Sequence, residues 1–301
     1  MHAAVLRYFQ EVARRGSVRR AAAVLNVASS AVNRQLLKLE AELGVQLFDR
    51  LPGGMRLTRA GELLLRHVGD TLHDFERVRA DIDDLRGVKT GHVAIAAVDS
   101  LLVEFLPQAI ETFRKEFPAV TYSVGAVAPA EVPAEVVAGR ADIGFTFVAK
   151  PPAGAQYYAS ISAPIGVVMA ANHPLARKRR ISFEDCRRFP ALLQEGPLPR
   201  AADIDPDFNA FRETLAPKLV SNSINLLKYA IHHNMGLSYF TKLGFLREIR
   251  EGELVWRPLA SRAINTLRLG LMTPTDRQLP IVTSMLVELL ARRLRDVERA
   301  A

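Results

Sequence analysis

Residues 16–44 read GSVRRAAAVLNVASSAVNRQLLKLEAELG, and this stretch decides the fold of the N-terminal region. Ser17 can cap a helix over residues 18–25, in which three consecutive alanines favour helical backbone. A short turn leads to a second helix over about residues 29–43, and Gly44 can end it in the left-handed conformation. Two short helices joined by a turn predict a helix-turn-helix, whose second helix can enter the major groove of DNA.

A β-hairpin, or wing, is predicted directly after these helices. Residues 46–50 and 55–57 alternate apolar and polar side chains, and residues 52–54, Pro-Gly-Gly, supply the tight turn. An amphipathic helix before Gly16 completes a winged helix-turn-helix. The side chains expected to contact DNA lie on the second helix and on or beside the wing: Ser29, Ser30, Asn33, Arg34, Lys38, Arg50, Arg56 and Arg59.

These polar side chains differ in how strongly they predict a base contact. Arg34 and Asn33 can bond base edges, since Arg pairs with guanine and Asn with adenine through two hydrogen bonds. Helix capping or contact with phosphate explains Ser29, Ser30 and Lys38 equally well. The wing arginines are expected to reach phosphates or the minor groove.

Positive charge is concentrated in the same region. The chain of 301 residues has a formal net charge of +8, from 40 Lys and Arg against 32 Asp and Glu. Residues 1–60 hold ten Lys and Arg and four Asp and Glu, so +6 of the +8 lies in a fifth of the chain. Such an excess is the electrostatic footprint of a DNA-binding module. Double-stranded DNA is therefore the predicted partner.

A long helix after the wing is predicted to pair two copies of the chain. Thr58 can cap it, and Glu62 suits the positive end of the helix dipole. Apolar positions then follow in steps of four and three, as in a coiled-coil seam, which predicts these dimerisation residues: Leu64, Val68, Phe75, Val78, Ile82 and Leu85. A helix packed only on its own domain is the alternative. Gly, Lys and Thr residues over 87–91 predict a short linker.

After the linker the pattern changes to alternating strands and helices. An apolar strand at residues 93–98 is followed by a helix over 102–117, a strand at 120–127, a helix at 133–138 and a strand at 141–147. This βαβαβ order predicts an open, mostly parallel α/β sheet.

The N-terminal residues resemble the LysR-type transcriptional regulators, a family of bacterial activators and repressors. The resemblance rests on these residues at fixed spacing: Leu6-Arg7-Tyr8-Phe9, Gly16-Ser17, Ala21-Ala22, Asn33-Arg34-Gln35, Leu39-Glu40, Leu43-Gly44-Val45, Leu47-Phe48-Asp49-Arg50, Leu57-Thr58 and Gly61. Further on, Gly139-Arg140-Ala141-Asp142 and His173-Pro174-Leu175 resemble landmarks of the family's effector-binding region. Ala28 stands where the family has a capping Ser, which predicts a second helix that begins one residue later, capped by Ser29.

The resemblance implies a fold and a division of the chain. It implies a winged helix-turn-helix, mainly α, over residues 1–60, a dimerisation linker helix and hinge over 61–91, and an effector-binding domain over 92–301. That domain would be α/β and similar to periplasmic binding proteins. Its two subdomains, 92–161 with 267–301 and 162–266, would hold the ligand in the cleft between them. In the family the linker helix pairs two chains on an inverted repeat, and dimers often join into tetramers.

Effector contacts are predicted where strands end, because ligands of such sheets lie outside the carboxyl ends of the strands. The predicted contact residues are Ser100, Leu101, Thr146, Phe147, Gln194, Asn222 and Ser223. Backbone N–H groups at the helix starts after Ser100 and Asn222 can hold a carboxylate or another anion. Residues 127–129, Val-Ala-Pro, predict an apolar wall. We therefore expect an anionic effector with a hydrophobic part, although ordinary helix capping explains Ser223 nearly as well.

The sequence carries no catalytic motif: it has no HExxH, no Gly-Lys-Ser/Thr phosphate loop and no Gly-x-Ser-x-Gly. The single cysteine, Cys186, is expected to be an inert thiol. We expect no enzymatic activity, cofactor or metal. The N-terminus lacks a secretory signal and no apolar run approaches a membrane span, which predicts a cytoplasmic protein with no membrane partner. The predicted function is sequence-specific control of transcription, modulated by a small effector. A solute-binding protein and an α/β enzyme are the alternatives.

Overall fold

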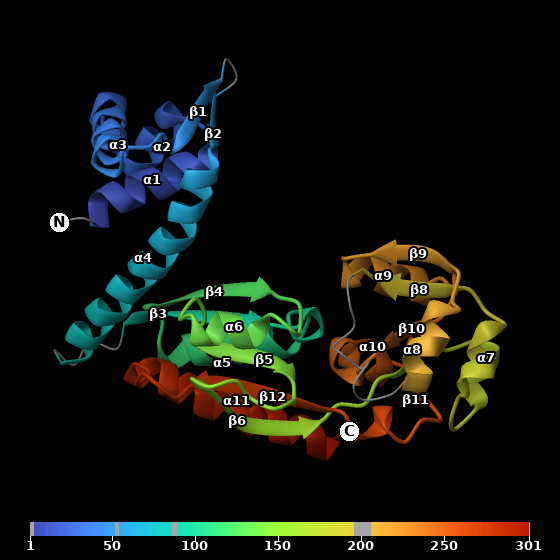
Figure 1. Ribbon diagram of the computed structural model, residues 1–301. Helices are drawn as coiled ribbons and strands as arrows, with labels where there is room; N and C mark the ends of the chain where they lie inside the picture. The colour runs from blue at the N-terminus through green and yellow to red at the C-terminus, as the bar shows by residue number, and fades with distance from the viewer. Residues whose placement is uncertain (1–2, 52–53, 86–89, 196–205, 301) are drawn as a thin grey trace. The chain divides into compact units, whose positions relative to one another are not determined.

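The computed structural model describes residues 3–51, 54–85, 90–195 and 206–300 (Figure 1). The chain forms two compact units, Met1–Gly91 and His92–Ala301. Residues 52–53 of the predicted wing turn at 52–54 and most of the predicted linker at residues 87–91 lie outside the described residues. Over the residues that are described, no helix is both long and apolar enough to cross a membrane.

The first unit contains three helices, a two-stranded wing and a long helix. Their bounds are α1 Ala3–Arg15, α2 Val18–Leu25, α3 Ser29–Leu43, β1 Phe48–Leu51, β2 Gly54–Leu57 and α4 Arg59–Leu85. The predicted cap of α2 is confirmed, since the Ser17 hydroxyl accepts a hydrogen bond from the backbone N–H of Arg20. Gly16 and Gly44 end α1 and α3 in left-handed backbone, with φ of 61° and 65°. The expected winged helix-turn-helix is present.

The helix predicted over about residues 29–43 is confirmed as α3, but the prediction that Ser29 caps it is wrong. The helix begins at Ser29, and Ala28 occupies the capping position without a side-chain hydrogen bond. The Ala28 carbonyl accepts from the N–H groups of Ala31 and Val32, so backbone geometry alone starts the helix. The exposed side chains of Ser29 and Ser30 are therefore not needed as caps of α3.

The core of the first unit joins its four helices to the wing. Its buried residues are Phe9, Val12, Ala21, Ala22, Val32, Leu36, Leu47, Phe48, Val68 and Leu72. Gly61 permits the closest approach, because a Cβ there would lie 2.2 Å from the Leu47 carbonyl oxygen. The Thr58 hydroxyl accepts a hydrogen bond from the Gly61 N–H and donates one to the Gln46 carbonyl. The start of α4 is thus fixed against the wing.

The second unit alternates strands and short helices. Its elements are β3 Gly91–Ala97, η1 Asp99–Leu101, α5 Phe105–Glu116, β4 Val120–Ala126, α6 Val132–Val137, β5 Ile143–Phe147, β6 Ala155–Ser162, β7 Gly166–Ala170, η2 Pro174–Arg177, α7 Phe183–Arg187, β8 Ala191–Gln194, α8 Pro206–Glu213, β9 Pro217–Ser221, α9 Ile224–His232, β10 Ser238–Phe240, η4 Lys242–Gly244, α10 Leu246–Arg250, β11 Leu254–Pro258, η5 Ile264–Thr266, β12 Arg268–Pro274 and α11 Ile281–Ala300. The helix predicted over residues 102–117 is shorter, because the one-turn helix η1 precedes it and α5 begins only at Phe105.

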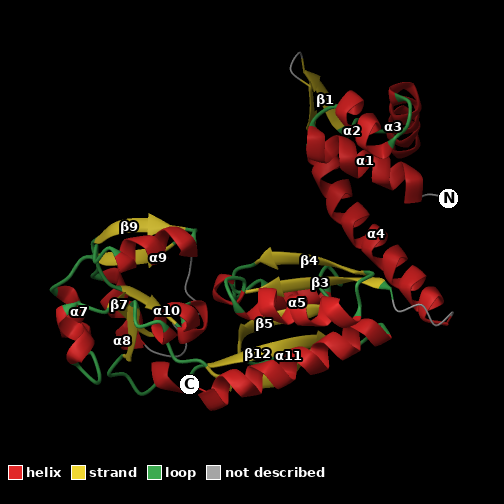
Figure 2. Cartoon of the chain, turned by 180° about the vertical axis from the view of Figure 1, so that it is seen from behind, coloured by secondary structure: helices red, strands yellow, loops and turns green. Residues whose placement is uncertain are grey.

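Five strands form the larger sheet, in the order β4-β3-β5-β12-β6 (Figure 2). β3 and β5 are parallel, but β12 is antiparallel to both β5 and β6. β3, β5 and β6 thus run in one direction, as a mostly parallel sheet requires, and β12 is the antiparallel strand that the sequence pattern did not predict. The sheet is mixed because β12 joins it only after the chain returns from the strands β7 to β11, which form two other sheets. α5 and α11 cover one face and α6 covers the other.

The remaining strands form two small sheets. β7 lies between β10 and β11 and is antiparallel to both, whereas β8 and β9 form a parallel pair. A single bridge between Ala191 and Leu237 links β8 to the residue before β10. One core, with Phe208 and Phe211, packs on one side of β7, and a second core, with Ile224 and Trp256, packs on the other. This arrangement brings the ends of β8, β9 and β10 close together.

Candidate DNA-binding surface and effector cavity

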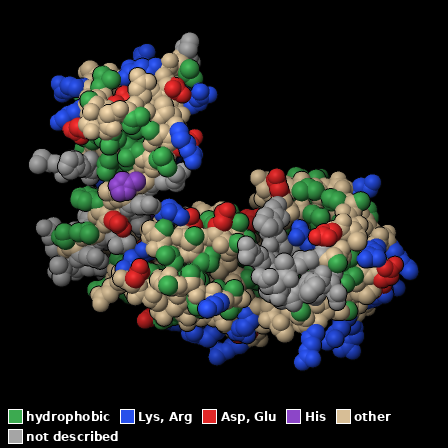
Figure 3. Space-filling view, viewed as in Figure 1, with side chains coloured by type: hydrophobic (Ala, Val, Ile, Leu, Met, Phe, Trp, Pro, Cys, Tyr) green, Lys and Arg blue, Asp and Glu red, His purple; other side chains and the backbone are tan. Residues whose placement is uncertain are grey.

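The DNA-binding surface centres on α3. Val32 and Leu36 are buried in the core of the first unit, so the opposite side of α3 faces solvent. The predicted contact residues on that side are exposed, apart from the half-buried Asn33: Ser29, Ser30, Arg34 and Lys38. Figure 3 shows Lys and Arg side chains along the edge of the unit that holds α3 and the wing. The helical period alone places this polar set on one surface.

The wing contacts α3 through a hydrogen bond between two predicted DNA contacts. Arg50 Nη2 donates to Asn33 Oδ1 at 3.5 Å. Across the hairpin, Arg56 lies 3.4 Å from the Asp49 carboxylate, and both arginines are exposed. Exposed ion pairs of this kind contribute little to stability, so phosphate can replace the carboxylate at small cost.

The other predicted cations differ in their partners. Lys38 lies 3.9 Å from Glu42, and Arg59 lies 3.0 Å from Glu62. Arg34 is exposed and forms no ion pair with any described residue. Among the cations of α3, Arg34 is therefore the more available for a base edge.

The predicted dimerisation residues of α4 fall into two groups. Val68 is 0% exposed and Leu64 is partly buried, both against the core of the first unit. Phe75, Val78 and Ile82 are about half exposed, at 50%, 54% and 46%. The prediction that Val68 is a dimerisation residue is wrong, because a side chain fully enclosed by its own unit cannot contact a partner. The Leu85 side chain lies outside the described residues.

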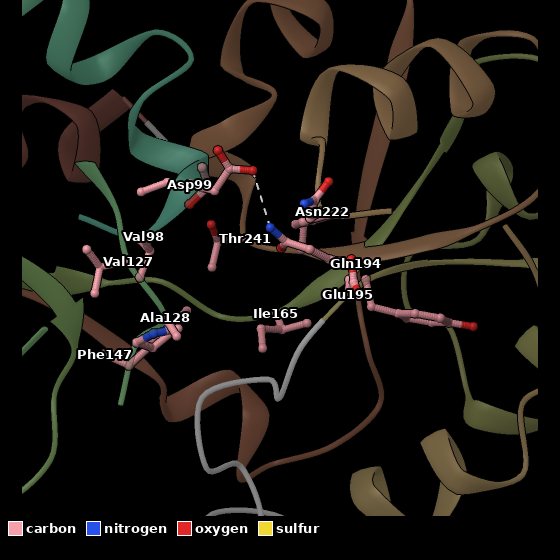
Figure 4. A pocket seen from close by; sticks show the side chains of 15 residues that line it. Val98, Asp99, Val127, Ala128, Phe147, Ile165, Gln194, Glu195, Asn222 and Thr241 are labelled. Carbon is pink, nitrogen blue, oxygen red and sulfur yellow. Dashed lines mark hydrogen bonds between the residues drawn. The ribbon is translucent and has the colours of Figure 1, made fainter. Parts of the chain in front are cut away.

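The second unit contains a cavity of about 260 Å³ where several of its strands end (Figure 4). Four of the seven predicted effector residues line it. Ser100 follows β3, Phe147 ends β5, Gln194 ends β8 and Asn222 follows β9. The predicted apolar wall at residues 127–129 also lines the cavity.

The other three predicted residues do not line the cavity. Leu101 is 0% exposed and belongs to the core between α5 and the larger sheet. Thr146 is 2% exposed, and its hydroxyl donates to the Pro129 carbonyl at 2.6 Å. Ser223 caps α9 by accepting from the Leu226 N–H at 3.4 Å. Within β5 the side chains alternate between the two faces of the strand, so Thr146 and Phe147 face opposite ways and only Phe147 lines the cavity.

Sequence reasoning missed one part of the cavity. Ile165, Tyr239, Phe240 and Thr241 line it from the ends of β7 and β10, and Val98 adds to the apolar side. The expectation that ligands lie beside parallel strands gave no signal for them, because β7 and β10 are antiparallel. Their place in the cavity depends on strand pairing, which local sequence patterns do not determine.

Asp99 occupies the position where an anion was expected. Its carboxylate accepts a hydrogen bond from Gln194 Nε2 at 3.2 Å and another from the backbone of Ile224, the first residue of α9. Burial raises the pKa of Asp99 above its ordinary value, and the Ile224 hydrogen bond opposes that rise. The Ser223 N–H at the start of α9 also has a partner, the Ser221 hydroxyl at 3.0 Å. These two backbone N–H groups at the start of α9 therefore already have acceptors that the protein itself supplies.

Over the described residues, the single cysteine lies apart from the cavity lining. Cys186 is buried in the core that contains Phe208 and Phe211, and burial raises its thiol pKa to about 12. Within residues whose placement is described, His, Cys, Asp and Glu form no group of three suited to a metal ion.

Comparison with known proteins gives matches over both units. Residues 86–295 match the LysR substrate binding domain, and residues 4–62 match the bacterial regulatory helix-turn-helix protein, lysR family. The chain is 26% identical over 277 residues to a probable RuBisCO transcriptional regulator of Chlorokybus atmophyticus, covering 88% of this chain and 87% of that protein. It is 30% identical over 188 residues to the HTH-type transcriptional regulator AlsR of Bacillus subtilis (strain 168), covering 62% of each. The fold is similar to that of full-length CbnR, solved with its target DNA, with a TM-score of 0.69 and 20% identity over 97% of this chain and 100% of that chain.

Proposed function

Since the chain belongs to the LysR family of bacterial helix-turn-helix regulators, we propose that this transcriptional regulator acts in the cytoplasm on promoters that carry an inverted repeat. It binds DNA and an effector and is not an enzyme. Homodimers or homotetramers are the active form. The proposed DNA contacts are those of α3 and the wing: Ser29, Ser30, Asn33, Arg34, Lys38, Arg50, Arg56 and Arg59.

The observation that carries the proposal is the basic, exposed side of α3. Arg34 has no ion pair with a described residue and lies on a helix that can fit into the major groove. Among the wing arginines, Arg50 donates to Asn33 on α3, whereas Arg56 and Arg59 pair with carboxylates that phosphates can displace. Side chains that can bond base edges and side chains that can neutralise the DNA phosphates thus lie on one surface.

Pairing of two chains through α4 brings a second copy of α3 to the second half-site of the operator. The exposed apolar side chains of Phe75, Val78 and Ile82 recur at coiled-coil spacing on the part of α4 beyond Leu72. Exposed apolar groups in a row are the feature that a partner helix covers. We expect the pair to address an inverted repeat, because a two-fold protein dimer matches a two-fold operator.

The effector would act through the cavity, because the cavity is lined from both subdomains. Asp99 and Phe147 belong to the subdomain of residues 92–161 with 267–301, whereas Gln194 and Thr241 belong to that of residues 162–266. The hydrogen bond between Asp99 and Gln194 therefore crosses from one to the other. A second crossing joins the Arg247 N–H to the Glu104 carboxylate at 3.0 Å. A ligand that prefers one spacing of the subdomains shifts the population toward it.

The test of this function is sequence-specific DNA binding by the purified full-length protein. We expect fluorescence anisotropy to show binding about 1,000-fold tighter to a fragment from upstream of its own gene than to a scrambled fragment of equal length, at one fixed salt concentration. Equal affinity for the two fragments would refute a sequence-specific regulator acting at that site.

A further inference from the structure

We propose that the effector cavity is selective for a protonated amine on a small apolar body, with Asp99 and Thr241 as the residues that hold the ammonium group. This inference rests on the proposed function of the cavity and names the chemical class of its ligand.

The charge of the cavity favours a cation. Its described lining contains two carboxylates, Asp99 and Glu195, and no Lys or Arg. Lys242 is adjacent in sequence to the lining residue Thr241, but its ammonium group lies 4.9 Å from the centroid of the Trp256 ring. An anionic ligand would therefore meet like charge without a compensating cation from the described lining.

The Asp99 carboxylate is held in place but is not neutralised. Gln194 and the Ile224 backbone, its hydrogen-bond donors, are both uncharged, and burial raises the pKa of Asp99. A carboxylate in this state gains most from a cationic donor, because charge-assisted hydrogen bonds are about twice as strong as neutral ones. A carboxylate can accept several hydrogen bonds, so an ammonium group can bind without displacing Gln194.

Thr241 supplies a second polar atom at the same place. The residue is 4% exposed and lines the cavity, and its hydroxyl oxygen has no hydrogen-bond partner among the described residues. A buried hydroxyl without a partner is costly and uncommon in native proteins. In Figure 4, Thr241 lies between Asp99 and the apolar residues Val127 and Ala128. An ammonium group has three N–H donors, so it can bond Asp99 and Thr241 together.

The apolar side of the cavity sets the size of the ligand. Val98, Val127, Phe147 and Ile165 line the cavity, and in Figure 4 Val127 and Phe147 lie on the side opposite Gln194 and Asn222. A cavity of about 150 Å³ holds benzene, so 260 Å³ accommodates a phenyl ring with a short polar arm. 2-Phenylethylamine and 3-phenylpropionate are therefore suitable probes, because they share this shape and differ in the sign of their charge.

The experiment compares the affinities of the two probes for the full-length protein by ligand-observed NMR at pH 7. We expect 2-phenylethylamine to bind at least about tenfold more tightly than 3-phenylpropionate, as one charge-assisted hydrogen bond provides. Tighter binding of the carboxylate, or no amine binding at about 10 mM, would overturn the proposal. DNA binding by the same protein without a probe tests the regulator function separately.

Two variants locate the amine. Asp99→Asn keeps the shape and removes the charge, and we expect it to weaken amine binding at least about tenfold and to lessen the preference for the amine. Thr241→Val should weaken amine binding about threefold to tenfold. Glu111→Gln, at an exposed carboxylate on α5, is the matched control and should change neither affinity. Circular dichroism identifies a variant that fails to fold. Unchanged amine affinity in a folded Asp99→Asn or Thr241→Val protein contradicts the assignment.

Discussion

The DNA-binding surface and the effector cavity are assembled in opposite ways. α3 presents its proposed contacts within residues 29–38 of a single exposed helix face. The cavity collects side chains from residue 98 to residue 241, from the ends of strands in separate sheets. The two sites also differ in charge, since the first is basic and the described lining of the second is acidic. The net charge of +8 therefore describes the DNA-binding surface and is no guide to the effector.

The largest expected effect tests whether specific DNA binding by the surface requires two chains, whereas ligand binding in the cavity does not. Changing both Phe75→Asp and Ile82→Asp should weaken dimerisation by at least about 100-fold, because burying unpaired charge in an apolar seam costs several kcal/mol. Sedimentation velocity measures the change, and specific DNA affinity should fall with it while amine binding stays. Leu63→Asp, at an exposed leucine outside the seam, is the control. A double variant that remains dimeric would show that α4 is not the interface.

The next effect concerns a single side chain of the surface. Arg34→Ala should lower affinity for the specific fragment about 10- to 100-fold, since a bidentate arginine contact with a base is worth about 1–3 kcal/mol. Anisotropy measures this affinity, and sedimentation should show unchanged dimerisation. Arg292→Ala removes the same charge at an exposed position of α11 and serves as the control. If Arg34→Ala and Arg292→Ala lower the affinity equally, Arg34 contributes only charge.

The smallest effect concerns a contact that holds the cavity wall. Thr146→Val removes the part-buried hydrogen bond to the Pro129 carbonyl and should lower the free energy of unfolding by about 1 kcal/mol. Calorimetry measures the change, and DNA affinity should stay the same. Thr266→Val is the matched control, because water can replace its exposed hydrogen bond to Ala263. An equal loss in both variants would mean that the Thr146 contact has no special role.

Several local features could be predicted because they depend on neighbouring residues. Ser17 caps α2 and Gly44 ends α3 for reasons of backbone geometry that act within one turn. The predicted cap of α3 by Ser29 is wrong because it assumes a capping side chain, whereas Ala28 caps the helix with its backbone alone. Val68 was assigned to the seam because coiled-coil and core packing share nearly the same spacing.

Features that depend on pairing of distant segments could not be predicted. Ser100 and Gln194 were found because each follows a strand whose end faces the cavity. Thr241 and Ile165 were missed because β7 pairs antiparallel with β10, which no short pattern encodes. Thr146 was assigned to the cavity by position, but its hydroxyl bonds Pro129.

By itself, the sequence determined the winged helix-turn-helix, the basic surface and the alternation of strands and helices, because periodicity, capping and charge are local properties. Only the tertiary structure decided the mixed sheet, the burial of Val68 and the chemistry of the cavity. The position of Asp99 shows the reason most directly. Its carboxylate contacts Gln194 and Ile224, 95 and 125 positions away in the chain, and takes the place at α9 that an effector anion was expected to fill. Which groups a buried site leaves free depends on such long-range partners, and these exist only once the chain has folded.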